Sequence, residues 1–426
     1  MKPITLVFQI HHPHKLRLYR FFDIGNDHYY YDDFANESSI RKKVAESYLP
    51  ANRLLQHKIA NNKGKLKVAF LISGSALELF RRYSPEMLES FKQLMETEQV
   101  EFLGTTSSNS IASLYDMDVF ANQVRDHSNV IDELTGLKPQ VFINSGMIYS
   151  NEIGAEAKRL GFKAAFIDDS KKVLGWRSPN QIYGDTTKPN FKLLVRNSLL
   201  NNRLIQIFSD NPENGAALSV DNFLSALVVQ NADDQVINLG FDYEILCHGQ
   251  PHNSSGFRVF NDFLSMVIHS GKVAAILPSE AVSQFPAVAS LSVPNPVTFN
   301  YEEEHGIAKW MGNELQNEAL SKLFRLSEMI RKCPDTKIIH DWNKLQDISH
   351  FNAMSSYRRE NGWNHTQHET FINYMNILSD LELRLEAFRA ADQKTQILQL
   401  KQKLKEKDSL IKECHEEIKT LKNKKK

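Results

Sequence analysis

The feature that most constrains the fold of this chain is the alternation of short apolar runs with longer helical patterns over its first two thirds. The predicted strands are Ile4–Ile10, Leu66–Ile72, Val100–Leu103, Gln140–Asn144, Lys163–Ile167, Lys192–Val195 and Val236–Asp242, with Val273–Leu277 as an eighth candidate. Near-continuous apolar strands joined through helices are typical of a parallel sheet. Seven or eight such units predict a closed or nearly closed barrel.

The pattern changes after these units. The helices predicted between the strands are Ser39–Lys58, Pro85–Glu98, Val119–Leu134, Ser150–Leu160, Val220–Val229 and Phe257–Ser270. Beyond them, the proline-rich stretch Ser292–Val297 predicts a boundary. Two more helical segments, Glu303–Arg331 and His368–Phe388, follow without a strand pattern. We therefore expect a barrel over residues 1–296 and an α-helical domain over residues 297–390.

A heptad repeat fills most of the remaining tail, residues 391–426. One seam position holds Ile397, Leu404, Ile411 and Ile418, and the other holds Leu400, Lys407, Cys414 and Leu421. About four heptads with a mostly apolar seam predict a coiled coil, so we expect a homodimer through Ile397–Leu421. A single solvated helix is the alternative, because the seam includes a lysine.

Composition excludes several function classes. The 426 residues are 42% hydrophobic and carry a formal net charge of zero, so neither nucleic acid nor a membrane surface is an expected partner. No run of eighteen apolar residues predicts a membrane span. Three widely separated cysteines favour a reducing, cytoplasmic compartment.

Metal and nucleophile motifs are also incomplete. The cluster His11-His12-Pro13-His14 does not predict a metal site, because adjacent histidines on a strand point to opposite faces. Ser73 and Ser145 lie in fragments of a nucleophile elbow, and Cys247 is a lone cysteine. The chain has no glycine-rich phosphate loop, so we expect no metal and no cofactor.

Polar residues follow nearly every predicted strand. They are His11-His12, Ser73-Gly74, Thr105-Thr106, Asn144-Ser145-Gly146, Asp168-Asp169, Arg196-Asn197 and Asp242. The carboxyl ends of barrel strands meet at one face, so we expect these residues to form a single polar mouth. The alternative is that loops are simply polar. Asp242 ends an apolar run of strand length, and acid–base chemistry there needs a second carboxylate.

Five separated motifs indicate a family. They are Gln9-Ile-His-His-Pro13, Val100–Leu114, Val141–Tyr149, Gly240-Phe-Asp-Tyr-Glu244 and Asp347–Ser355. In this order, over roughly residues 4 to 388, they resemble the α-amylase-type members of glycoside hydrolase family 57. The resemblance implies an α/β fold: an incomplete (β/α)7 TIM-like barrel followed by an α-helical domain, with the coiled-coil helix added at the C-terminus. It also implies an α-glucan or maltooligosaccharide as the ligand.

The resemblance assigns roles to the site positions and reveals departures from the family pattern. Family members are retaining enzymes, with a glutamate nucleophile on the fourth strand and an aspartic acid on the seventh. The acid position matches Asp242, whereas the nucleophile position falls on Gly146. The second motif holds Thr105 and Asn109 in place of Glu and His, and the first holds His12 in place of Gln.

The same resemblance places substrate contacts around these two positions. They are His11, His12, Thr105, Asn109, Tyr243, His248, Trp310 and His350. Trp176, Trp342 and Trp363 are further candidates for an aromatic sugar platform, or for core packing.

Three functional hypotheses follow. A retaining site needs two carboxyl groups about 5–5.5 Å apart, so Gly146 predicts a catalytically impaired glycan-binding homologue. A second hypothesis is an active hydrolase or transferase in which Asp168, Asp169 or Glu152 replaces the nucleophile. The third is an oligomeric scaffold that acts through the coiled coil.

Overall fold

The computed structural model describes residues 1–208, 219–229, 231, 233–246, 255–298, 306–357 and 365–423, and its centre is a ring of seven parallel strands. The strands of the ring are β1 (Lys2–Ile10), β2 (Val68–Ile72), β3 (Val100–Phe102), β4 (Val141–Phe142), β5 (Ala164–Ile167), β7 (Lys192–Val195) and β8 (Ile237–Asp242). Each was predicted from its apolar run. The chain therefore has the (β/α)7 barrel fold expected of it.

Two sheets make up the ring, and two narrow joints close it. One sheet runs β3-β2-β1-β8 and the other contains β7-β5-β4. A single bridge between Gly104 and Phe142 joins β3 to β4, and another between Arg196 and Asn238 joins β7 to β8. Gly104 is required at the first joint, because an added Cβ there would collide with the Phe162 ring.

Three further strands lie outside the ring. The eighth candidate is a strand, β9 (Val273–Ala275), but it pairs beside the start of β1. β6 (Ile182–Asp185) runs antiparallel to β7 and also pairs with β10 (Ser290–Leu291). Neither β6 nor β10 was predicted, because each is short and its sequence is not a continuous apolar run.

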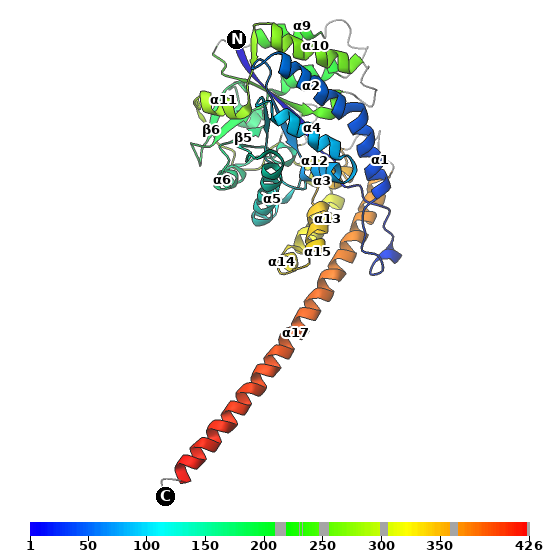
Figure 1. Ribbon diagram of the computed structural model, residues 1–426, viewed down its shortest axis with the longest axis vertical. Helices are drawn as coiled ribbons and strands as arrows, with labels where there is room; N and C mark the ends of the chain where they lie inside the picture. Colours follow the sequence, from blue (N-terminus) through cyan, green and yellow to red (C-terminus); the bar gives the residue numbers. More distant parts are fainter. Residues whose placement is uncertain are drawn as a thin grey trace.

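Helices surround the ring (Figure 1). They are α1 (Asp33–Lys43), α2 (Leu49–Asn61), α3 (Gly74–Tyr83), α4 (Pro85–Met95), α5 (Met117–Thr135), α6 (Asn151–Arg159), α7 (Lys171–Leu174), α8 (Ser198–Phe208), α9 (Val220–Val228), α10 (Ser255–His269) and α11 (Pro278–Gln284). α3 and α8 were not predicted, since both begin within the polar residues that follow a strand. A π-helical turn, Val44–Tyr48, separates α1 from α2 within the predicted Ser39–Lys58 helix.

The alternation of side chains along the strands separates two packed layers. On β1, Leu6 and Phe8 pack outward against the surrounding helices, whereas Val7 points into the barrel. Val7 meets inward-facing residues of the other strands, among them Ala69, Leu103, Val141, Ala164 and Leu194. The barrel is thus a filled core, and its polar groups are left to the strand ends.

The remaining helices lie over the carboxyl ends of the strands. They are α12 (Ala308–Met311), α13 (Glu314–Arg325), α14 (Ser327–Arg331), α15 (Thr336–Leu345), α16 (Ile348–Ala353) and α17 (Gln367–Asn423). Ile348 N–H donates to Asn109 O at 3.1 Å, and Ile111 N–H donates to Gln346 O at 3.1 Å, which ties this region to the loop after β3.

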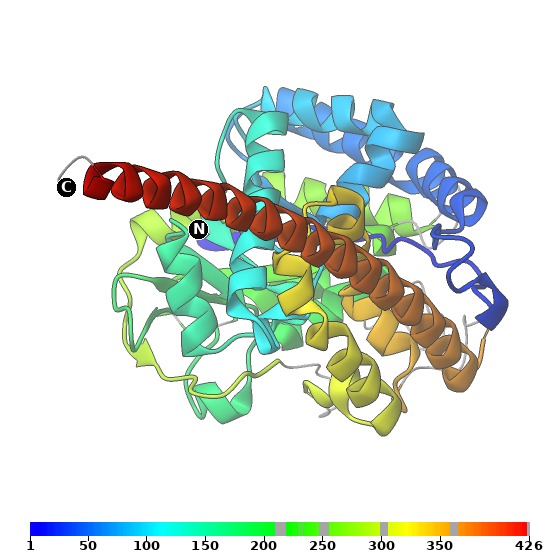
Figure 2. The same ribbon diagram turned by 90° about the horizontal axis from the view of Figure 1, so that it is seen from below.

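α17 is packed at its start and free at its end. Tyr374, Ile377, Leu381 and Leu385 are buried against the other C-terminal helices, whereas the second half projects away from the molecule (Figures 1 and 2). Within the described ranges, no helix has the length and apolar character needed to cross a membrane.

Candidate active site

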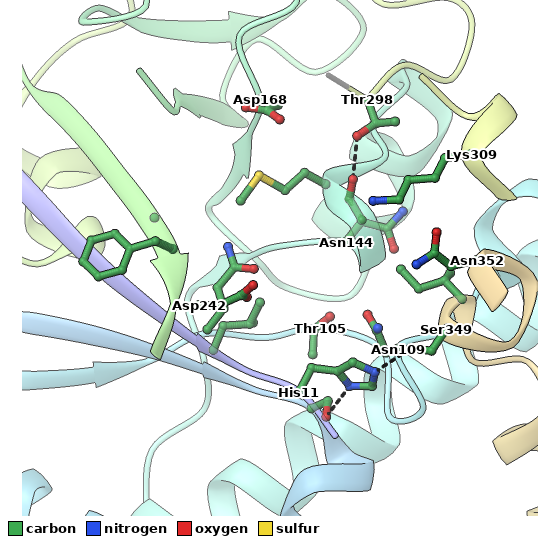
Figure 3. Close-up of a pocket in the computed structure, with 18 of the residues that line it drawn as sticks. His11, Thr105, Asn109, Asn144, Asp168, Asp242, Thr298, Lys309, Ser349 and Asn352 are labelled. Carbon is green, nitrogen blue, oxygen red and sulfur yellow. Dashed lines mark hydrogen bonds between the residues drawn. The ribbon is translucent and has the colours of Figure 1, made fainter. Parts of the chain in front are cut away.

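A cavity of about 470 Å³ opens at the carboxyl ends of the strands, under the C-terminal helices. It brings together six of the residues for which the motifs and the family resemblance predicted a role: His11, Thr105, Asn109, Gly146, Asp242 and Trp310. Figure 3 shows how the labelled side chains surround it. The polar mouth predicted from the strand ends is therefore a real feature of the molecule.

Asp242 stands at the last position of β8, opposite Gln9 of β1. Its side chain is open to the cavity and makes no hydrogen bond to the described part of the chain. The surrounding protein and, second, the nearby Glu244 raise the pKa of the Asp242 carboxyl above its ordinary value. Electrostatic interactions with His11, Arg196 and Lys309 oppose that rise. Asp242 is consequently biased toward the protonated form that a general acid needs.

Gly146 lies in a short turn after β4, with φ at 59° and ψ at 17°. Only glycine adopts this left-handed conformation without strain. The space beside it is filled by the Trp310 ring: an added Cβ would lie 2.7 Å from Trp310 Cζ2 and closer still to Cη2. Thr298 Oγ1 also donates to Gly146 O at 2.6 Å. The place from which a nucleophile would project is thus occupied by an indole.

The proposed replacement carboxylates are differently placed. Asp168 lines the cavity, but Arg196 holds both of its oxygens, with Nε and Nη2 each at 2.8 Å. Asp169 instead accepts from the Ser198 backbone and hydroxyl, and burial raises the pKa of Asp169 to about 6. Glu152 lies on α6 and does not line the cavity.

His11 is fixed from both sides of its ring. Nδ1 lies 2.9 Å from Ser73 Oγ, and Nε2 lies 3.2 Å from both Asp347 Oδ2 and Ser349 Oγ. Burial would raise the pKa of Asp347, but the His11 charge and hydrogen bond lower it overall. Asp347 was not predicted as a site residue, although it opens the fifth motif. The sequence marked Asp347 only by its place at the start of that motif. Its contact with His11 could not be predicted, because the two residues are far apart in the chain.

Two polar groups face the cavity without a hydrogen-bond partner among the described residues. Asn109, held at φ 49°, makes no side-chain hydrogen bond to the described residues, and Asn352 Oδ1 is buried and likewise unpaired there. Buried polar groups are usually satisfied, so unpaired ones that face a cavity are suited to a polar ligand. Across the described ranges, no group of three or more His, Cys, Asp or Glu side chains is arranged to hold a metal ion.

Three predicted substrate contacts lie away from the cavity. His12 is buried on the opposite face of the strand from His11, 2.8 Å from the Tyr48 hydroxyl. Tyr243 is fully buried and donates to Asn52 Oδ1 at 2.8 Å. The His350 ring packs on Tyr374, with centroids 5.6 Å apart. These side chains support the cavity wall, and His248 falls outside the described residues.

The tryptophans divide between core and cavity. Trp342 is buried and donates to Leu323 O at 2.9 Å, whereas Trp176 is 94% exposed. Trp310 alone of the described tryptophans lines the cavity. Trp363 falls outside the described residues.

Comparison with known proteins points in one direction. The family model described as Glycosyl hydrolase family 57 matches residues 5–294. A protein of Methanocaldococcus jannaschii described as "Putative alpha-amylase" is 28% identical over 402 residues, which are 89% of this chain and 84% of that protein.

Solved structures share the fold at low identity. A family 57 branching enzyme from Thermococcus kodakaraensis, determined in complex with glucose, gives a TM-score of 0.67 at 10% identity and 90% coverage of both chains. A 4-alpha-glucanotransferase from Thermococcus litoralis gives 0.66 at 13% identity, covering 88% of this chain and 59% of that one. A branching enzyme from Pyrococcus horikoshii gives 0.64 at 12% identity, covering 89% and 88%.

Proposed function

Because the chain belongs to glycoside hydrolase family 57, we propose that it is an α-amylase-like protein that binds a saccharide in the barrel cavity but no longer cleaves it by the retaining mechanism. The ligand class is an α-glucan or maltooligosaccharide, since the solved proteins of the same fold include branching enzymes and a glucanotransferase.

The observation that carries the loss of cleavage is the pairing of Gly146 with Trp310. A retaining site needs a carboxylate about 5–5.5 Å from the acid, to form the covalent glycosyl intermediate. At Gly146 there is no such group, and the Trp310 ring fills the space that it would need. The Trp310 ring therefore packs against Gly146, and the missing glutamate side chain leaves no void there.

A relocated nucleophile has less support. Asp168 is the remaining carboxylate candidate that lines the cavity, and it is bound at both oxygens by Arg196. Attack on a sugar would require that pair to break in a partly buried site, which is costly because Arg196 would lose its counter-ion. Asp168 thus supports the cavity wall.

Hydrolysis of maltooligosaccharides tests the catalytic claim. Purified wild-type protein and its Asp242→Asn variant are expected to release reducing ends at the same background rate. An added α-amylase verifies that the assay detects cleavage. A wild-type rate clearly above that of Asp242→Asn would overturn the proposal, because only a working acid makes the two differ.

Calorimetric titration tests the binding claim. Maltoheptaose at millimolar concentration is expected to release heat on wild-type protein, and less on Asn109→Ala, which removes an unpaired amide from the cavity. Absence of heat at that concentration would remove binding of a neutral α-glucan from the proposal.

A second candidate function, a dimeric scaffold, is supported by the tail. Ile397, Leu404, Ile411 and Ile418 recur every seven residues on α17, and each is at least half exposed. Exposed apolar residues at this spacing form the seam of a coiled coil when a second helix covers them. Light scattering is expected to give a dimer for the full chain and a folded monomer after deletion of residues 391–426. A full-length monomer would exclude this function.

A further inference from the structure

We propose that the saccharide bound in this cavity carries a carboxylate, as a uronate does, and that Lys309 selects it. The inference rests on the proposed saccharide binding and favours an acidic sugar over the neutral α-glucan. It comes from the charges of the cavity rather than from its shape.

The charged residues of the cavity wall fall into paired and unpaired groups. Asp168 and Arg196 neutralise one another through two 2.8 Å hydrogen bonds. His11 faces Asp347 at 3.2 Å. Two charged side chains of the lining then remain without a hydrogen bond or ion pair to the described residues, Asp242 and Lys309. The retaining site implied by the family motifs would instead hold carboxylates at the positions of Gly146 and Thr105.

Lys309 brings a positive charge to the side of the cavity where the nucleophile position lies. It is the second residue of α12, and its side chain extends into the cavity (Figure 3). Its ammonium lies 6.0 Å from the centroid of the neighbouring Trp310 ring. That ring is the one that abuts Gly146. The nucleophile carboxylate of the family is thus missing at Gly146, and the Lys309 ammonium lies on the side of the cavity where that carboxylate would be.

A neutral sugar would leave this ammonium without an ion-pair partner among the described residues. Hydroxyl groups accept hydrogen bonds from an ammonium, but a carboxylate accepts them and also neutralises the charge of the ammonium. A bound ligand also excludes water from Lys309, and an unpaired charge removed from water is unfavourable. A carboxylate on the sugar satisfies Lys309 directly.

Asp242 is compatible with the same ligand. A carboxylate ligand would repel an ionised Asp242, but the protonated acid can donate a hydrogen bond to it. The enclosure that favours the protonated acid in the free protein therefore acts in the same direction as the ligand. Binding of an acidic sugar should accordingly be accompanied by uptake of a proton at Asp242.

A matched pair of ligands isolates the charge. Maltotriose and the α-1,4-linked triglucuronate share linkage and ring configuration and differ at C6, which carries CH2OH in one and a carboxylate in the other. Calorimetric titration of the full chain is expected to give about tenfold tighter binding of the uronate at low salt. Lys309→Gln should abolish the preference, and Lys309→Arg should keep it.

Lys42→Gln is the control for net charge, since Lys42 is exposed on α1 outside the cavity and its loss should leave the preference unchanged. Thermal unfolding of each variant verifies that it is folded. Equal affinity for the two sugars, or a preference that survives Lys309→Gln, would overturn this inference and leave saccharide binding intact. Absence of binding by either sugar would overturn both.

Discussion

At Gly146, backbone conformation and packing act in the same direction. A left-handed residue other than glycine is strained by about 1–2 kcal/mol. Independently, any side chain there meets the Trp310 ring. The two effects are separable, because the backbone strain arises at residue 146 itself, whereas the collision depends on the Trp310 side chain.

A double-mutant cycle separates them. Gly146→Ala is expected to lower the free energy of unfolding by about 2–4 kcal/mol, since an overpacking term adds to the backbone term. In a Trp310→Ala background the same change should cost only about 1–2 kcal/mol. Gly271→Ala is the control for the backbone term, because Gly271 has φ of 63° and open space beside it. Urea unfolding measures all of them, and equal costs in both backgrounds would contradict the packing claim.

Asp242 gives the opposite kind of prediction, a gain in stability on substitution. Its pKa is raised in the folded protein, so its unfavourable contribution is absent below the ordinary aspartate pKa and grows as the pH rises through the folded value. Asp242→Asn should therefore be more stable than wild type at pH 7, and the difference should vanish near pH 3. Asp168→Asn should instead be less stable at pH 7, because Arg196 loses its partner. Thermal unfolding across this pH range checks both signs.

The sequence identified the site residues that stand in motifs and missed those that reach the cavity only through the folding of the chain. Gly146 and Asp242 were identified because they stand at the nucleophile and acid positions of the family motifs, and both line the cavity. Arg196 was expected at the polar mouth but received no specific role, and Lys309 was not expected there at all, since nothing in its local sequence indicates that it reaches the cavity. The same limit explains Tyr243, which stands beside Asp242 in the motif but points into the core.

Among the elements, the ring strands were predictable because each is an apolar run buried on both sides. α3 was not, because its first turn, Gly74-Ser75, is polar and was interpreted as a loop. Yet Ser73 caps this helix by accepting from Ala76 N–H at 3.2 Å, and Ser84 begins α4 without making a capping bond.

α3 also connects the barrel to α15 through Glu78. Its carboxylate lies 2.6 Å from Lys344 Nζ, 3.3 Å from His340 Nε2 and 3.5 Å from His14 Nε2. Burial alone would raise the pKa of Glu78, but the hydrogen bonds from the two histidines and the Lys344 charge hold it well below its ordinary value. The contact therefore joins the two regions electrostatically at neutral pH.

This contact predicts acid lability. A lowered folded pKa contributes stability above the ordinary glutamate pKa of about 4.3, and that stability is lost as the pH falls below it. Glu78→Gln should be less stable than wild type at pH 7 and should lose less stability between about pH 5 and pH 2. Glu89→Gln, an exposed change on α4, is the control. Parallel acid-unfolding curves for wild type and Glu78→Gln would contradict this role.

At the scale of the whole molecule, we propose a division into a barrel (residues 1–296), an α-helical domain (297–390) and a tail (391–426). The tail is the part whose role is most easily tested. The part of α17 beyond residue 390 extends about 50 Å at 1.5 Å per residue. Its apolar seam was visible in the sequence because heptads are local. Whether a second chain covers the seam is a property of two molecules, which a single sequence does not encode directly.

Cys414 reports the orientation of the proposed dimer. It is exposed and occupies a seam position, so a parallel, in-register pair places two copies opposite one another. Diamide is expected to produce a disulfide-linked dimer that is absent from Cys414→Ser. A dimer by light scattering that does not cross-link would indicate antiparallel helices instead.

The two joints of the barrel have a mechanical consequence. Most neighbouring ring strands share ladders of several residues, whereas β3 meets β4 and β7 meets β8 through single bridges. The ring is therefore rigid within each sheet and more easily deformed where β3 meets β4 and where β7 meets β8. Thr105 and Gly146 flank the first joint at the cavity, and Arg196 and Asp242 flank the second. A sugar that touches all four residues would link the two sheets across both single bridges and restrict the movement of one sheet relative to the other.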